Sequence, residues 1–388
     1  MAFEFLTDNV LQQKARARYR VRQCNAEQNG REVTINKKAY LNFSSNDYLG
    51  LNHHPEINAA LQEGADRFGT CASGSSLITG YSYAHQALEN DICQWLNKPR
   101  CLLFASGFSA NTAMMQALGD QSCHLFLDKL SHASLIDGAL DSKAKVKRFL
   151  HNDTQQLQRL LVKDANSSQV NSNKVIVSEG VFSMDGDKAN VAELAKISRE
   201  HQALLYLDDA HSIGVVGDRG QGSSASAEVD VVMATFGKAL ATSGAFVACD
   251  EIVADYLINF SRHYIYSTAI SPALAWATKK SIEIAQKESW RREKILQLST
   301  LLASKLSSNV KLMSNESSIH AIVIGAETST LDVCQKLREK GIWLTAIRPP
   351  TVPNKSSRLR VTITSKHKDN DINYLANCIN EVIDSCPN

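Results

Sequence analysis

The sequence lacks the cysteine spacing, the long apolar run and the N-terminal signal that mark several classes of protein. Its nine cysteines form no C-x-x-C pair and are odd in number, which favours reduced thiols over a disulfide framework or a zinc site. No run approaches the roughly 20 apolar residues of a membrane-spanning helix. The first residues have neither the basic region nor the apolar core of a signal peptide. We therefore expect a cytoplasmic protein that does not enter a membrane.

Charge imbalance and phosphate-binding glycine motifs are also missing. The formal net charge of +2 argues against a nucleic-acid binder, which needs a concentrated basic face. The main local exception is the basic segment 143–148, which we interpret as a solvated helix end or loop, although an acidic partner could dock there. The glycines between residues 214 and 222 do not form G-x-G-x-x-G, and no Walker pattern is present. A nucleotide-binding Rossmann site is therefore disfavoured.

The apolar runs that are present predict an α/β fold. Short strands are expected at 32–35 and 39–43, followed by strands at 101–105, 124–128, 174–177, 204–207, 230–234 and 244–248, with helices at 84–96, 107–118 and 191–201 between them. A helix is also predicted at 8–22. Strands that alternate with helices favour a mostly parallel central sheet flanked by helices.

The C-terminal part has a different pattern of charged and apolar residues. The chain's 388 residues also exceed the roughly 250–300 at which a single hydrophobic core stops growing. A charge-rich helical run covers 273–306, and after it strands are predicted at 321–324, 342–345 and 359–363, with helices at 331–340 and 369–383. This pattern predicts a smaller α+β domain. We place the domains at 1–45 (N-terminal helix and small strands), 46–275 (large α/β domain) and 276–388.

Two apolar runs end in chemically distinctive residues. The run 230–234 leads into Thr235-Phe-Gly-Lys238, and the run 204–207 leads into Asp208, Asp209 and His211. Neighbouring strands of an open α/β sheet present their carboxyl ends to one crevice, so an amine, a carboxylate and an imidazole could meet there. Pyridoxal phosphate (PLP) needs a lysine for its Schiff base and a carboxylate on its ring nitrogen. The alternative is a solvated lysine and an Asp pair that serves a turn or a helix cap.

Two further positions could serve the same cofactor. Gly107 and Phe108 follow a strand and open a helix, where free N–H groups and the positive end of the helix dipole make an anion site. His132 lies just beyond the strand 124–128, where its imidazole could stack on a planar ring. A lone histidine is more often a capping or surface residue. The hydroxyl of Thr235 could donate to a phosphate.

The chain resembles the α-oxoamine synthases, a family of PLP-dependent enzymes of fold type I, over essentially its whole length. The resemblance is carried by blocks in order: 41–50 (LNFSSNDYLG), 106–108 (SGF), 130–134 (LSHAS), 179–186 (EGVFSMDG), 208–211 (DDAH) and 235–238 (TFGK). The segment 346–353 (AIRPPTVP) with Arg358-Leu-Arg360 is similar to the members that use alanine. Cys71–Ser75 and Lys355–Ser356 depart from the family's pattern.

The resemblance implies a role for each matching residue. Catalysis would fall to Lys238, His132 and Asp208: Lys238 would bond the cofactor and move a proton, Asp208 would pair with the ring nitrogen, and His132 would stack on the ring. The implied cofactor-binding residues are Gly107, Phe108, Ser183, Asp208, His211, Thr235 and Lys238, and the implied substrate-binding residues are Arg20, His132, Arg348, Thr351 and Arg360. No metal is expected.

The resemblance also implies a reaction and partners. We expect a decarboxylating condensation of L-alanine with a pimeloyl thioester, carried on acyl carrier protein or coenzyme A, in a homodimer. Two alternatives stay open. One is another α-oxoamine synthase that joins glycine to an acetyl or succinyl thioester, or serine to a long acyl chain. The other is a binding protein in which Asp208, Asp209 and His211 hold a metal, which leaves Lys238 without a purpose.

Overall fold

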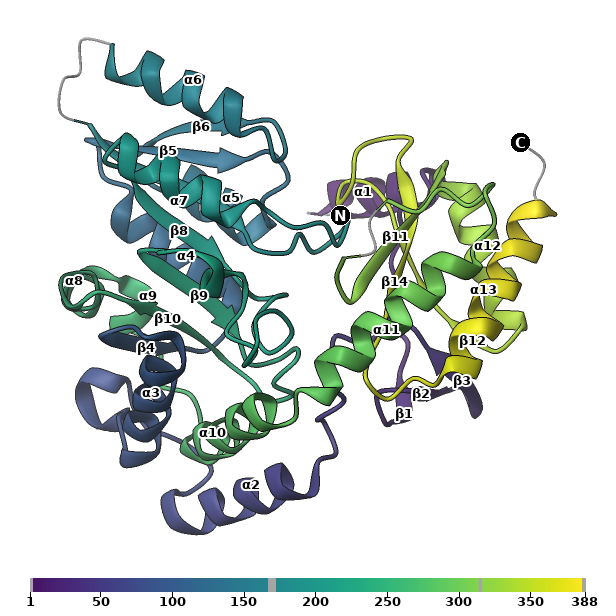
Figure 1. Cartoon of the computed structure of the whole chain (residues 1–388), viewed down its shortest axis with the longest axis horizontal. Coiled ribbons are helices and arrows are strands. Elements are labelled where there is room, and N and C mark those ends of the chain that lie inside the picture. The colour runs from purple at the N-terminus through teal and green to yellow at the C-terminus, as the bar shows by residue number, and fades with distance from the viewer. Residues whose placement is uncertain (1–2, 167–171, 314–315, 386–388) are drawn as a thin grey trace. The chain divides into compact units, whose positions relative to one another are not determined.

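The computed structural model describes residues 3–166, 172–313 and 316–385 (Figure 1). The chain forms two compact units. The small unit comprises the described parts of residues 1–50, 183–187 and 293–388, and the large unit those of 51–182 and 188–292. The breaks after residues 50 and 292 differ from the predicted ones after 45 and 275, and the N-terminal 50 residues belong to the same unit as the C-terminal part.

The large unit is built on a seven-stranded sheet with the order β4-β10-β9-β8-β7-β5-β6. Its strands are β4 (Arg100–Phe104), β5 (Cys123–Asp128), β6 (Lys145–Phe149), β7 (Asn173–Glu179), β8 (Leu204–Asp208), β9 (Val231–Thr235) and β10 (Ala245–Cys249). β10 runs antiparallel to both of its neighbours, whereas the pairs from β9 to β6 are all parallel. This arrangement confirms the predicted mostly parallel sheet.

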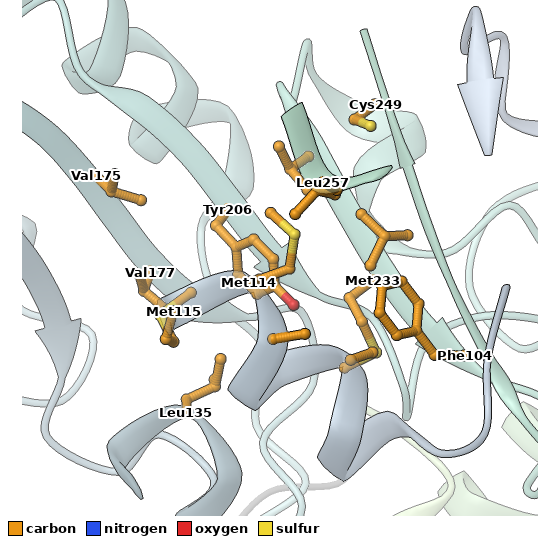
Figure 2. Close-up of a cluster of buried hydrophobic side chains, with 14 of the residues drawn as sticks. Phe104, Met114, Met115, Leu135, Val175, Val177, Tyr206, Met233, Cys249 and Leu257 are labelled. Atoms are coloured by element: carbon orange, nitrogen blue, oxygen red, sulfur yellow. The ribbon is translucent and has the colours of Figure 1, made fainter. Parts of the chain in front are cut away.

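Apolar residues cover both faces of this sheet. Successive residues of a strand point to opposite faces, so a strand can contribute to two core clusters. Leu125, Val175, Val177 and Met233 join one core cluster with residues of the helices α4 (Gly107–Leu118), α5 (Ala133–Leu140) and α8 (Glu251–Phe260). Figure 2 shows Tyr206 and Met114 within it. The residues that alternate with them, including Phe126, Ile176 and Val232, join a second cluster with residues of α6 (Thr154–Ala165) and α7 (Val191–Glu200). A strand that is apolar on both faces reads as a continuous apolar run, which is why these strands were predictable.

The helices of the large unit follow the strands and begin at polar caps. They are α2 (Pro55–Phe68), α3 (Tyr83–Leu96), α4 (Gly107–Leu118), α5 (Ala133–Leu140), α6 (Thr154–Ala165), α7 (Val191–Glu200), α8 (Glu251–Phe260), α9 (Arg262–Ile265) and α10 (Pro272–Lys287), with single turns at Ser76–Gly80 and Ser223–Ser226. The side chains of Ser106, Asp153 and Asn190 each accept a hydrogen bond from the first turn of the helix that they precede. Such caps satisfy backbone N–H groups that have no partner inside the helix.

The small unit has two short sheets and its own core. One sheet has the order β1-β2-β3-β12 and the other β11-β14-β13. The elements are α1 (Glu4–Ala15), β1 (Asn25–Gln28), β2 (Glu32–Ile35), β3 (Lys38–Asn42), α11 (Trp290–Lys305, which begins in the large unit), β11 (Ile319–Gly325), α12 (Glu327–Glu339), β12 (Ile342–Trp343), β13 (Thr345–Ile347), β14 (Ser357–Thr362) and α13 (Asp369–Asp384). Buried apolar residues of β14, α12 and α13 form its core.

Three predicted elements are wrong in extent or type. The helix expected at 8–22 spans Glu4–Ala15. It buries none of its residues, so no packed apolar face determines where it begins and ends. The run 273–306 is two helices, α10 and α11. The basic segment 143–148, expected as a helix end or loop, contains the strand β6 at the edge of the sheet, where an outer row of charged side chains discourages pairing with another chain. Within the described parts of the chain, no helix has the length and apolarity needed to cross a bilayer.

Candidate active site

Two neighbouring parallel strands of the large unit, β8 and β9, end side by side in Asp208 and Thr235. Lys238 lies three residues beyond β9, and its Nζ is 2.8 Å from Nε2 of His211, which follows β8. Both Asp208 and Lys238 act electrostatically on His132, so these four side chains share one region. The structure therefore brings together the amine, the carboxylate and the imidazoles that the sequence placed at strand ends.

Asp208 is buried and held by two N–H donors. Its Oδ1 accepts from the backbone N of Ala210 at 2.9 Å, and its Oδ2 accepts from Nδ2 of Asn111 at 2.7 Å. Asn111 lies in α4 and Ala210 in the turn after β8. Because donors from two directions fix both oxygens, the carboxylate has one orientation. It is suited to face a cationic ring nitrogen.

His132 is the N-cap of α5, and both its backbone and its ring are anchored. Its backbone N donates to Oε1 of the buried Glu179 at 2.6 Å. Its Nδ1 lies 2.8 Å from Oγ of Ser134. Burial lowers the pKa of His132, while Asp208 raises it, Lys238 lowers it further and Asp137 raises it. The net shift is downward from a usual value near 6.5, so the ring is neutral at neutral pH.

The first turn of α4 has the geometry that an anion site requires. Ser106 caps the helix, so the N–H groups of Gly107 and Phe108 at its first two positions have no acceptor inside the helix. A methyl group added to Gly107 would lie 3.6 Å from Cβ of Thr235, which places the helix start against the end of β9. The hydroxyl of Thr235 itself donates to the backbone O of Gly244 at 2.9 Å. A phosphate group fits the exposed N–H groups at this helix start.

Asp209 is buried and held by contacts that differ from those of Asp208. It is fully buried, its Oδ2 accepts from the backbone N of Ser224 at 3.0 Å, and burial raises its pKa to about 6. A methyl group on Gly180 or Gly222 would lie 2.0 and 2.4 Å from its carboxylate oxygens, so only glycine fits at either position. Among the described residues, no group of three His, Cys, Asp or Glu side chains could hold a metal ion, which counts against the metal-binding alternative.

In the small unit, three of the predicted substrate-binding residues lie together. Nη2 of Arg20 is 3.5 Å from Oγ1 of Thr351. Arg348 donates to the backbone O of Ala17. Burial lowers the pKa of Arg348, and the nearby Arg20 lowers it further. Two guanidinium groups that repel each other favour an anion between them.

Ser183 and Arg360 also meet in the small unit. Nε of Arg360 donates to the backbone O of Ser183 at 2.7 Å, and its Nη1 lies 3.2 Å from Oδ1 of Asn46. Arg358 pairs with Asp185 in the same segment. These contacts make the segment 183–187 part of the small unit although both of its flanks belong to the large one.

The residues that contact the predicted ones include four to which the sequence analysis gave no role: Asn46, Asn111, Ser134 and Glu179. Asn46 and Glu179 lie in the blocks 41–50 and 179–186 that carry the resemblance, but the loop of Asn46 has the composition of a turn and Glu179 ends a strand, so neither was given a role. Asn111 lies 97 residues before Asp208. No local spacing could have found it. The partners of a catalytic residue are set by the fold, and only the three-dimensional arrangement identifies them.

Comparison with known proteins gives concordant results. Residues 38–379 match the family model of aminotransferases class I and II. The 8-amino-7-oxononanoate synthase of Pectobacterium atrosepticum is 44% identical over 360 residues, which are 92% of each chain. A solved structure of that enzyme from Francisella tularensis aligns with a TM-score of 0.76 at 29% identity, over 89% of this chain and 98% of that one.

A serine palmitoyltransferase variant from S. paucimobilis, solved with bound PLP, has a TM-score of 0.91 at 24% identity, over 98% of this chain and 97% of that one. At this identity the likeness concerns the fold alone. It confirms the predicted fold class, a mixed sheet with parallel central strands flanked by helices.

Proposed function

This chain belongs to the aminotransferase class I and II family and, within it, to the PLP-dependent 8-amino-7-oxononanoate synthases, and we propose that it joins L-alanine to a pimeloyl thioester. In this reaction a carbon–carbon bond forms between Cα of alanine and the thioester carbonyl carbon. The thiol leaves, and the alanine carboxylate departs as carbon dioxide. The product, 8-amino-7-oxononanoate, would serve biotin biosynthesis.

The observation that carries this proposal is the donor set of the large unit, which fits PLP group by group. Lys238 offers the amine that bonds the cofactor's aldehyde, and His211 lies 2.8 Å from that amine. Asp208 offers a fixed, buried carboxylate for the ring nitrogen. The N–H groups of Gly107 and Phe108 offer a phosphate site. PLP supplies an electron sink for the negative charge that develops on Cα of the amino acid.

The side chains then have separate tasks. Asp208 keeps the positive charge on the ring nitrogen, which makes the sink effective. Lys238 would take a proton from Cα of the amino acid, which leaves the electron pair on that carbon, and would later return a proton. The pKa of His132 is lowered from its usual value, and its neutral ring would donate a hydrogen bond to the substrate carbonyl oxygen. Ser183, His211 and Thr235 complete the proposed cofactor contacts.

We assign Arg20, Arg348 and Thr351 to the acyl substrate. The pimeloyl chain ends in a free carboxylate, and guanidinium groups bind carboxylates through charge-assisted hydrogen bonds. Burial and Arg20 together lower the pKa of Arg348, so an anion between the two groups would relieve their repulsion. Arg360 is proposed to bind the alanine carboxylate. An acyl carrier protein, which is acidic, would suit these basic residues by its charge.

The proposal includes a homodimer in the cytoplasm. Helix α1 buries none of its residues and exposes Phe5, Leu6 and Leu11, and its N-cap Phe3 is exposed as well; a second copy of the chain would cover this apolar surface. All eight described cysteines are unpaired, in keeping with a reducing compartment. Sedimentation equilibrium of the purified protein tests the dimer, and a monomer at micromolar concentration would refute it.

The amino acid preference separates the proposed reaction from the related ones. We expect the purified holoenzyme, given pimeloyl thioester and L-alanine, to form a product with the mass of 8-amino-7-oxononanoate. Glycine or serine with acetyl, succinyl or palmitoyl thioester should form at least about tenfold less product, a difference of about 1.4 kcal/mol in transition-state binding. Mass spectrometry of the quenched reactions gives the answer. Faster turnover of glycine with acetyl thioester would favour the alternative synthase.

A substitution at Arg348 tests the assignment of the acyl site. For Arg348→Met we expect the KM for pimeloyl thioester to rise about tenfold, because one charge-assisted hydrogen bond to the terminal carboxylate is lost. The KM for L-alanine should not change. Heptanoyl thioester, which lacks the terminal carboxylate, should be used equally by the wild type and the variant. Arg16→Met, at the exposed end of α1, is the control and should behave as the wild type.

A further inference from the structure

Asn111 of α4 lies at the centre of a buried chain of hydrogen bonds that ends at His132. Its Oδ1 is 2.6 Å from the hydroxyl of Tyr206. Its Nδ2 is 2.7 Å from Oδ2 of Asp208 and 2.9 Å from Oγ of Ser134. Ser134 Oγ is in turn 2.8 Å from Nδ1 of His132. Tyr206, Asn111 and Ser134 are almost completely buried, and Figure 2 shows Tyr206 in the core.

The direction of these hydrogen bonds is fixed from the Asp208 end. A carboxylate can only accept, so the side of Asn111 that faces Asp208 must be its NH₂ group. The amide oxygen then faces Tyr206, whose hydroxyl donates to it. The NH₂ group has two hydrogens, and its second acceptor is Ser134 Oγ. Asn111 is therefore fully used, with one hydrogen bond accepted and two donated.

Ser134 determines which nitrogen of the His132 imidazole carries the hydrogen. Its hydroxyl accepts from Asn111, so its single hydrogen is available for Nδ1 of His132. The backbone N–H of Ser134 also points to this nitrogen, at 3.3 Å. Two donors converge on Nδ1, which therefore carries a lone pair and no hydrogen. In a neutral imidazole the hydrogen must then be on Nε2.

We infer that Asn111 and Ser134 are positioning residues that hold His132 as the neutral tautomer with its hydrogen on Nε2, the atom left to donate to the substrate. This inference rests on the proposed function for the meaning of that donor, but the tautomer itself is a property of the protein alone. Outer residues of this kind fix the orientation and the protonation of a functional histidine. The same amide also orients Asp208, so one side chain aligns the ring-nitrogen partner and the substrate donor.

The charged groups around His132 come from several elements. Asp208 ends β8, Lys238 follows β9, Asp137 is on α5, and Glu179 at the end of β7 accepts from the His132 backbone N. Asp208 and Asp137 favour the imidazolium, whereas Lys238 and burial disfavour it. Protonation at Nδ1 would also break the hydrogen bond from the Ser134 hydroxyl. The hydrogen bonds that run from Tyr206 through Asn111 and Ser134 to His132, which we call the relay, thus act in the same direction as burial. Both favour the neutral ring.

The tautomer can be measured directly by NMR of protein labelled with ¹⁵N-histidine. His132→Gln identifies the His132 signals, and the spectrum is recorded at neutral pH both without PLP and with PLP bound. We expect Nδ1 to resonate as a nitrogen that bears no hydrogen and Nε2 as one that does. The opposite pattern, or an imidazolium at neutral pH, would overturn the inference. Failure of the proposed function would instead appear as absence of product while this pattern remains.

Ser134→Ala breaks the relay and leaves the bond from Asn111 to Asp208 in place. Removing the hydroxyl removes the cost of protonating Nδ1, so we expect the His132 pKa measured by NMR to rise by roughly half to one unit. The acid limb of the kcat profile should move to higher pH by the same amount. Ser131→Ala is the matched control, because the buried hydroxyl of Ser131 has no hydrogen-bond partner among the described residues.

The two serine variants decide the question together. An unchanged His132 titration in Ser134→Ala, or an equal shift in Ser131→Ala, contradicts the inference. Should Ser134→Ala fail to fold, Asn111→Ala replaces it. There the Ser134 hydroxyl is no longer held as a donor, and His132 should titrate at higher pH and populate both neutral tautomers. A single Nε2–H tautomer with an unchanged pKa in Asn111→Ala would show that the relay does not set the imidazole.

Discussion

Replacing Lys238 with alanine is expected to abolish both the covalent attachment of PLP and turnover. The alanine side chain has no amine to bond the aldehyde, and the variant lacks the base that would take the proton from Cα. A positioned acid–base group alone contributes about 10²- to 10⁴-fold, so the loss in kcat should be at least about a thousandfold. The visible absorption of the purified protein after dialysis and the rate of product formation measure the two effects.

The control for Lys238→Ala is a lysine of the same unit that has a defined partner elsewhere. Lys280 on α10 donates to Glu283 at 2.7 Å, and Lys280→Ala should keep the absorption and the rate of the wild type. Thermal melting of both variants shows whether they fold. A folded Lys238→Ala protein that retains turnover would contradict the assignment of Lys238.

Replacing Asp208 with asparagine is expected to separate cofactor binding from catalysis. The variant should still bind PLP, because Lys238 and the start of α4 remain. A neutral amide, however, no longer stabilises positive charge on the ring nitrogen. A neighbouring opposite charge shifts a pKa by about 1–3 units, so the reactive protonated form, and with it kcat, should fall about 10- to 1,000-fold. Steady-state kinetics and the absorption spectrum together measure this.

Asp137→Asn is the matched control for Asp208→Asn. Asp137 also raises the pKa of His132, but it makes no hydrogen bond to the proposed catalytic groups, so its substitution should change kcat only a few-fold. The loss in Asp208→Asn should also persist at saturating PLP. Recovery of the wild-type rate on addition of PLP would mean that Asp208 only helps to bind the cofactor.

The sequence predicts the central sheet well because its strands are apolar on both faces. β5, β7, β8 and β9 each read as a continuous apolar run and could not be confused with an amphipathic element. β6 was predicted wrongly because Lys145, Lys147 and Arg148 dominate it. Only the sheet order shows that it is an edge strand, and Lys147 finds its partner in Asp164 of α6.

Some residues of the candidate site could likewise be predicted from the sequence, and others could not. Lys238, Asp208 and His132 follow strand ends, where a sequence pattern can place a side chain without knowledge of the packing. Asn111 and Ser134 look like ordinary helix residues, and their importance depends on contacts made across the fold. The breaks between the two units were equally hidden, because the segment 183–187 joins the small unit through Arg358 and Arg360.

The account depends on Lys238 as the residue that holds PLP, and borohydride reduction followed by peptide mapping tests this most directly. Reduction makes the bond between the cofactor and the protein permanent, and mass spectrometry of the digest locates it. We expect the peptide that contains Lys238 to gain the mass of the reduced cofactor in the wild type. PLP attached to a different lysine, or a protein that takes up none, would contradict the account.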